Sequence, residues 1–193
     1  MAKIKIMAVA GSLRVGSYNK KLLKTAVRGA EESGADVTVV DLKNFPMPPY
    51  DGDLEAAEGL PENAKKLKQL MIEQDGFIIS SPEYNSSIPG TFKNVIDWVS
   101  RPEPTDKVTL PAFRGKVSAI MSASPGPLGG LRCLIHLRAI LENIYVMVVP
   151  DQVTIASANE AFDENERLKD LQKEKKVLSL SANLVNILTK LKS

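Results

Sequence analysis

Short hydroxyl side chains, one arginine and one asparagine gather in a loop that follows the first apolar run of the chain. From Gly11 to Asn19 the sequence reads GSLRVGSYN. Ser12 and Ser17 can donate short hydrogen bonds, and Arg14 carries a permanent charge that can bind an oxyanion through two parallel N–H groups. These residue types at this spacing predict a loop that binds a phosphate group.

The elements on either side would place this loop where anions bind well. Residues 4–10 are almost all apolar, as in a parallel strand covered on both faces. Apolar residues then recur at helical spacing over 22–30, which predicts a helix that begins near residues 17–19. The helix dipole and unpaired N–H groups favour an anion at such a junction. We expect Gly11 and Gly16 to adopt positive φ and to let the backbone approach the ligand.

Two better-known phosphate loops do not fit this sequence. A Walker A loop needs Lys-Ser or Lys-Thr after its second glycine, where this chain has Ser17-Tyr18. The G-x-G-x-x-G turn of dinucleotide-binding folds is absent as well, so we interpret Asp41 as an ordinary residue at the end of a strand and not as a ribose ligand. The loop therefore suits the single terminal phosphate of a mononucleotide.

Length, composition and charge set wider limits on the protein. The chain has 193 residues, of which 44% are hydrophobic, and a formal net charge of +2. These values predict one domain over residues 1–193 and give no reason to expect nucleic acid as a partner. The one cysteine, Cys133, is compatible with a reducing cytoplasm. We recognise no signal peptide and no apolar run long enough to cross a membrane.

The rest of the chain alternates between strand-like and helix-like segments. Strands are predicted at 37–41, 76–81, 116–123 and 145–149. Helices are predicted from Pro61, over 91–100, over 131–141, and in a last segment with Leu168, Leu171, Leu178, Ala182, Val185 and Leu188 on its buried side. This alternation predicts an α/β fold: a flavodoxin-like three-layer sandwich with a five-stranded parallel sheet of order 2-1-3-4-5 and helices on both faces. The loops 11–19, 82–85 and 122–130 then follow neighbouring strand ends and converge on one ligand.

Two motifs together carry a resemblance to a known family. AGSLRVGSYN at 10–19 and SPEYNSSIPGTFKNVIDW at 81–98 resemble the NADPH-dependent FMN reductase family, in its chromate and quinone reductase branch. The resemblance implies that the first motif binds the FMN phosphate, that the second holds the isoalloxazine ring, and that a third loop lies beside the ring. The implied cofactor-binding residues are Gly11, Ser12, Arg14, Ser17, Tyr18, Asn19, Pro82, Glu83, Tyr84, Asn85, Ser122, Ser124 and Gly126.

The activity implied is an FMN-dependent oxidoreductase. NAD(P)H would pass hydride to the flavin N5, and quinones, free flavin, chromate or azo compounds would then take the electrons in a ping-pong cycle. No catalytic side chain and no metal are expected, because the flavin carries the chemistry. We expect backbone N–H groups of Glu83, Tyr84 and Asn85 to face the ring, and Tyr84 to shape its open side. The resemblance also implies a homodimer or homotetramer, and leaves the choice of NADPH or NADH open.

Several alternatives stay open at this point. The chain can be a flavodoxin-type electron carrier that does not oxidise NAD(P)H, or a sensor that binds a phosphorylated ligand without redox chemistry. Glu83 can act as a general acid or pair with an arginine across a subunit boundary. Cys133 and His136 lie three residues apart, but without a second pair we expect core or surface positions and no metal site. Ser86 stands where many relatives have glycine, and Tyr18 where phenylalanine is frequent.

Overall fold

Five parallel strands form one sheet in the order β2-β1-β3-β4-β5, which confirms the predicted flavodoxin-like topology. The computed structural model describes residues 3–192. The strands are β1 (Lys5–Ala10), β2 (Asp36–Val40), β3 (Gly76–Ser80), β4 (Val117–Ala123) and β5 (Met147–Ile155). Because the direction of strand succession reverses between β1 and β3, the crevice at their carboxyl ends is where such a fold binds ligands.

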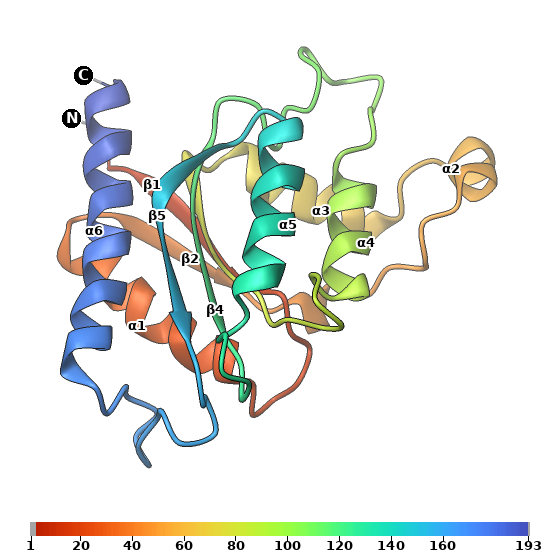
Figure 1. Cartoon of the computed structure of the whole chain (residues 1–193). Coiled ribbons are helices and arrows are strands. Elements are labelled where there is room, and N and C mark those ends of the chain that lie inside the picture. Colours follow the sequence, from red (N-terminus) through yellow and green to blue (C-terminus); the bar gives the residue numbers. More distant parts are fainter. Residues whose placement is uncertain (1–2, 193) are drawn as a thin grey trace.

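The described residues, 3–192, contain six α-helices. They are α1 (Tyr18–Glu32), α2 (Gly52–Glu58), α3 (Glu62–Ile72), α4 (Gly90–Val99), α5 (Leu131–Asn143) and α6 (Leu171–Lys192). Helices α1 and α6 cover one face, α3, α4 and α5 cover the other, and α2 projects from the body (Figure 1). None of the helices within residues 3–192 combines the length and the apolar character that crossing a bilayer requires.

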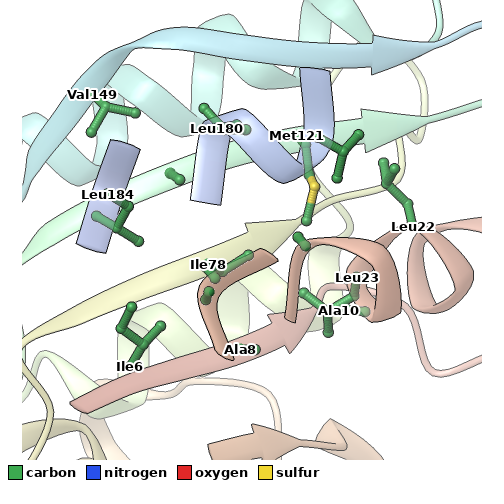
Figure 2. Packing of buried hydrophobic residues seen from close by; sticks show 14 of the residues in the cluster. Ile6, Ala8, Ala10, Leu22, Leu23, Ile78, Met121, Val149, Leu180 and Leu184 are labelled. Carbon is green, nitrogen blue, oxygen red and sulfur yellow. The ribbon is translucent and has the colours of Figure 1, made fainter. Parts of the chain in front are cut away.

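The two faces of the sheet bury separate apolar clusters because side chains alternate along each strand. On the α1 and α6 side, Ala8 and Ala10 of β1 are small and let α1 lie close to the sheet. Figure 2 shows Leu22 and Leu23 of α1 near Ala10, and Leu180 and Leu184 of α6 over the part of the cluster that contains Ile78, Met121 and Val149. On the other side, Val9 and the other buried apolar residues on this face of the sheet pack against α3, α4 and α5. The central strands are buried on both faces, which explains their nearly unbroken apolar sequences.

The last third of the chain departs from the predicted elements. The strand expected at 145–149 instead runs over Met147–Ile155, past Pro150 and Asp151. Proline is tolerated there because β5 is an edge strand, and the pairing with β4 shifts register near its middle.

Helix α6 confirms part of the predicted buried side: Val185 and Leu188 are buried, whereas Leu178 and Ala182 are half-buried. Its buried residues are Val177, Leu180, Ser181, Leu184, Val185 and Leu188. Leu171 is 74% exposed, and the buried Leu168 precedes the helix in a bridge with Phe162. The prediction was wrong about Leu171 and about where the helix begins, because it started the helical repeat at a residue of the preceding loop. Helix α2 was not predicted, in keeping with the absence of buried residues in it.

Candidate functional site

The carboxyl ends of the strands lie at the lower edge of the sheet in Figure 1. Those of β1, β3 and β4 open onto one hollow of about 320 Å³. Three loops line it, as the sequence predicts. The lining residues are Ser12, Arg14, Ser17, Tyr18, Asn19, Pro82, Glu83, Tyr84, Ala123, Ser124 and Pro125. The other predicted residues, Gly11, Asn85, Ser122 and Gly126, lie outside this lining.

The first loop ends where Ser17 caps helix α1. The Ser17 hydroxyl accepts a hydrogen bond of 3.2 Å from the backbone N–H of Asn19, and Ser17 itself is extended. Arg14 reaches the carbonyl oxygen of Gly16 at 3.0 Å, and its guanidinium lies 5.0 Å from the centre of the Tyr18 ring. A cation, a serine and the start of a 15-residue helix therefore face the same end of the hollow.

The expectation of positive φ at Gly11 and Gly16 is wrong, because neither is among the residues with positive φ. A Cβ at Gly11 would lie 3.1 Å from the ring of Phe92, so glycine there makes room for α4. A Cβ at Gly16 would meet nothing within 4 Å. The open space at Gly16 suits a loop that a ligand approaches closely.

Asn19 is 2% exposed, and its side chain is held by hydrogen bonds to the ends of β3 and β4. The Nδ2 atom donates to the carbonyl oxygen of Ala123, and Oδ1 accepts from the N–H of Ala123 and the hydroxyl of Ser80. Ser80 was not predicted for the site, since a serine at the end of a buried strand has no distinguishing signal in the sequence.

Glu83 of the second loop caps helix α5. One carboxylate oxygen accepts from the backbone N–H groups of Arg132 and Cys133 at 3.1 and 3.3 Å, and the other from Arg132 Nε at 2.8 Å. The Glu83 side chain is 8% exposed, whereas that of Arg132 is 54% exposed. We considered an arginine partner for Glu83 across a subunit boundary. The structure shows that Arg132 of the same chain is its partner. The sequence separation of 49 residues explains why this pair could not be predicted.

Tyr84 and Ser87 close a tight two-residue turn. The N–H of Tyr84 donates to the carbonyl of Ser87, and the N–H of Ser87 donates back. The central residues Asn85 and Ser86 have φ of 50° and 67°, as a type I′ turn requires. The Tyr84 N–H is therefore engaged in the turn, contrary to our expectation that it faces a ring, which leaves the N–H groups of Glu83 and Asn85 as candidates. The Tyr84 side chain is 53% exposed beside the hollow.

The third loop reaches the hollow through Ala123, Ser124 and Pro125. Ser122 is fully buried, and its hydroxyl lies 3.7 Å from the Cys133 sulfur. A Cβ at Gly130 would lie 1.9 Å from the Ser122 hydroxyl oxygen, and Gly130 has φ of 87°. Glycine is thus required where α5 begins. Ser122 and Gly126, which were predicted to lie beside the ring, are not among the residues that line the hollow.

The structure also shows the contacts of three other residues that the sequence analysis considered: Asp41, Cys133 and His136. Asp41 accepts a hydrogen bond of 2.7 Å from Lys20. Burial alone would raise the pKa of Asp41, but hydrogen bonds from Lys20 and from the backbone N–H of Lys43 outweigh it and lower that pKa. Cys133 is buried, while His136 is exposed and lies 2.9 Å from the Ser87 hydroxyl. No cluster of three or more potential metal-ligating His, Cys, Asp or Glu side chains occurs between residues 3 and 192.

A segment beyond the predicted loops supports the phosphate end of the hollow. Phe162 stacks on Tyr18 with ring centres 6.4 Å apart and planes 6° from parallel. Glu166 accepts a hydrogen bond from Lys24 of α1, which helps hold this segment against the helix and lowers the pKa of Glu166. The Tyr18 ring therefore contacts both Phe162 and the guanidinium of Arg14. No sequence motif marked Phe162, because it lies in an irregular segment before α6.

The residues around the hollow fit the FMN that the sequence resemblance implies. The volume lies at the lower end of the range of about 300–1,000 Å³ for small-molecule sites. Arg14, Ser12 and Ser17 supply the charge and hydroxyl groups that a phosphate needs. The exposed Tyr84 supplies an aromatic face. These residues would hold the phosphate at one end and a planar ring at the other.

Comparisons with known proteins agree with this fit. Residues 4–160 match the family described as NADPH-dependent FMN reductase. The chain is 36% identical over 170 residues to an NAD(P)H-dependent FMN reductase of Pseudomonas aeruginosa, which covers 86% of this chain and 85% of the relative. It is 36% identical over 149 residues to a quinone reductase of Escherichia coli K12, which covers 76% and 74% of the two chains.

A solved structure shares the whole fold. The flavoenzyme NAD(P)H:(acceptor) oxidoreductase FerB of Paracoccus denitrificans superposes with a TM-score of 0.78 at 27% identity, over 97% of this chain and 98% of the other. Family and relatives imply FMN as the cofactor, NAD(P)H as the co-substrate and small-molecule electron acceptors. The chain is thus an oxidoreductase that belongs to the NADPH-dependent FMN reductase family.

Proposed function

We propose that this protein is an FMN-dependent NAD(P)H:quinone oxidoreductase that works by a ping-pong cycle. The observation that carries the proposal is the single hollow to which the loops after β1, β3 and β4 all contribute. FMN held by these loops would supply the hydride and electron chemistry between NAD(P)H and an acceptor. One site that serves both partners in turn is the reason to expect ping-pong kinetics.

The side chains in this proposal bind and orient. Arg14 and Ser12 hold the phosphate, together with the amino end of α1, where Ser17 already caps the helix. Pro82 and the N–H groups of Glu83 and Asn85 support the ring, and Tyr84 covers part of its open side. No side chain moves a proton in this scheme, so substrate choice depends on the shape of the hollow.

The test is an absorption experiment on the purified protein with added FMN. We expect a bound flavin band that NADPH or NADH bleaches under anaerobic conditions and that a benzoquinone restores. Replacement of Arg14 by alanine should weaken FMN binding about tenfold or more, since a charge-assisted phosphate contact is lost. A band that neither nicotinamide bleaches would favour an electron carrier, and failure to take up FMN would refute the assignment of the hollow.

The acceptor and the kinetic scheme are tested with the same protein. Free FMN, chromate and an azo dye belong to the proposed acceptor range and can replace the quinone in the assay. Parallel lines in double-reciprocal plots, with NADPH varied at several quinone concentrations, are expected for a ping-pong cycle. A dead-end inhibitor pattern that requires two separate sites would contradict it.

We further propose that the chain acts as one domain over 1–193 and assembles as a homodimer or homotetramer in the cytoplasm. The single cysteine supports a reducing compartment. Four large apolar side chains lie exposed around the start of α5: Tyr84, Leu128, Leu131 and Ile135. We call these residues the α5 apolar patch. Its position beside the hollow supports an assembly with the site near the interface.

A further inference from the structure

Asn19 differs from the other residues expected to touch the phosphate. Nearly all hydrogen-bonding groups of its side chain already have partners within the chain. It is 2% exposed in the first turn of α1. Its Oδ1 accepts hydrogen bonds of 2.9 Å from both the Ala123 N–H and the Ser80 hydroxyl, which occupies both lone pairs. Its Nδ2 donates to the Ala123 carbonyl oxygen at 2.8 Å. Only one amide hydrogen remains for any other contact.

The orientation of the Asn19 amide is determined by its partners. Ala123 presents a donor and an acceptor to the two ends of the amide, in the same pairing that neighbouring strands use. Rotating the amide by 180° would set oxygen against oxygen and N–H against N–H. The side chain therefore has one arrangement that satisfies all its hydrogen bonds.

These bonds connect the three loops of the hollow. Asn19 belongs to the helix that follows the phosphate loop, Ser80 ends β3 just before Pro82, and Ala123 ends β4 just before Ser124. The backbone adds a bond of 2.9 Å from the Gly11 N–H to the Ser80 carbonyl. The buried amide of Asn19 thus joins the phosphate end of the hollow to the ring end, in addition to this backbone bond.

We infer that Asn19 is a positioning residue: it sets the phosphate loop relative to the two ring-side loops and contributes little direct binding energy to the phosphate. The inference rests on the proposed flavin site. It predicts that loss of Asn19 weakens the binding of any flavin that spans the loops, whether or not the flavin carries a phosphate. A residue that contacts the phosphate directly affects FMN alone.

The test compares two flavins that differ only in that group. FMN and riboflavin are titrated into the flavin-free protein, and dissociation constants are measured from the quenching of flavin fluorescence. For Asn19→Ala we expect both constants to rise by about tenfold, with their ratio unchanged within about twofold. For Arg14→Ala we expect the FMN constant alone to rise, which shifts the ratio about tenfold.

Ser80→Ala provides a second variant that cannot touch the ligand. Ser80 has no exposed surface, and its hydroxyl donates to Asn19. We expect both flavins to bind about threefold more weakly to Ser80→Ala, and the double variant to bind no more weakly than Asn19→Ala alone. This variant keeps the test decisive if Asn19→Ala does not fold.

A stability control separates positioning from general loosening of the fold. Val177→Ala removes a buried contact of α6, away from the hollow, and should lower the free energy of unfolding with both dissociation constants within about twofold of the wild type. A loss of FMN binding alone in Asn19→Ala would overturn the inference, as would unchanged binding of both flavins in Ser80→Ala. A wild-type protein that binds neither flavin would instead refute the proposed function itself.

Discussion

At the scale of single residues, the hollow is held in shape by polar groups whose partners lie far away in the sequence. Asn19 bonds to Ala123 over 104 residues, and Glu83 bonds to Arg132 over 49. No polar side-chain atom that is buried within residues 3–192 lacks a hydrogen-bond partner. Buried polar groups are costly when unpaired, so these contacts restrict the loops to one arrangement.

Ser86 is a residue whose backbone conformation does not suit its side chain. Its φ of 67° belongs to the left-handed region, where a residue with a Cβ loses about 1–2 kcal/mol relative to glycine. Ser86→Gly would create the Asn-Gly pair typical of a type I′ turn. We expect it to raise the free energy of unfolding by about 1 kcal/mol, measured by urea denaturation. Asn85→Gly should give a smaller gain, because asparagine tolerates positive φ; equal or greater gain there would contradict this account.

Cys133 should be inert in the folded protein. Burial raises the pKa of its thiol from about 9 to about 11, more than its contacts with Ser122 and Ser81 lower it. The unfolded state then releases the proton first, so stability falls as the pH rises from 9 to 11, by about 2 to 3 kcal/mol in total. Urea titrations of wild type and Cys133→Ala at several pH values isolate this slope. Alkylation by iodoacetamide at pH 8 without prior unfolding would disagree with the burial.

At the scale of elements, the start of α5 depends on another loop. Its N-cap residue, Gly130, provides no side chain, and Glu83 supplies the missing acceptors. A carboxylate at the amino end of a helix is also favoured by the helix dipole. The second loop of the hollow and helix α5 therefore form one unit, although sequence motifs alone associate Glu83 with the cofactor.

Variants of Glu83 test this role against that of a general acid. We expect Glu83→Ala to cost about 2 kcal/mol of unfolding free energy, and Glu83→Gln less, because a glutamine oxygen still caps the helix. Steady-state NADPH oxidation by Glu83→Gln should stay within about threefold of the wild type. The control is Arg132→Ala, which removes a half-exposed ion pair and should cost less than about 1 kcal/mol. A loss of activity of about a hundredfold in Glu83→Gln would point to acid catalysis.

At the scale of the whole molecule, the apolar residues exposed near the hollow set this region apart. The α5 apolar patch combines Leu128, Leu131 and Ile135 with Tyr84 of the site. A cluster of this kind on the surface marks an interaction site more often than scattered single residues do. The mild net charge of +2 gives no repulsion that would keep copies of the chain apart.

We expect the wild type to elute as a dimer or tetramer and Ile135→Glu to form a smaller species, because a charge would be buried at the interface. Size-exclusion chromatography with light scattering measures both masses. Leu191→Glu is the control, since Leu191 is 63% exposed on α6, on the other side of the sheet. A wild type that is already monomeric, or an assembly sensitive only to Leu191→Glu, would contradict the proposed interface.

The sequence alone determined the layout of this protein. Apolar runs of strand length, helical repeats and the GSLRVGSYN loop predicted the sheet order, the three site loops and a phosphate at the first of them. These signals are local: they depend on spacing, helix starts and glycine positions within about twenty residues. They failed where local patterns were ambiguous, as at Pro150 within β5 and at Leu168 before α6.

Only the tertiary structure decided what the individual side chains of the site do. Asn19 and Glu83 occur in motifs that suggest ligand contact, and the structure adds that their hydrogen bonds connect loops and cap a helix. Phe162 and Ser80 were not predicted from the sequence. Their contacts with Tyr18 and Asn19 exist only in the folded chain. A hydrogen bond depends on distance and direction in space, and residues a hundred positions apart acquire these only when the sheet forms.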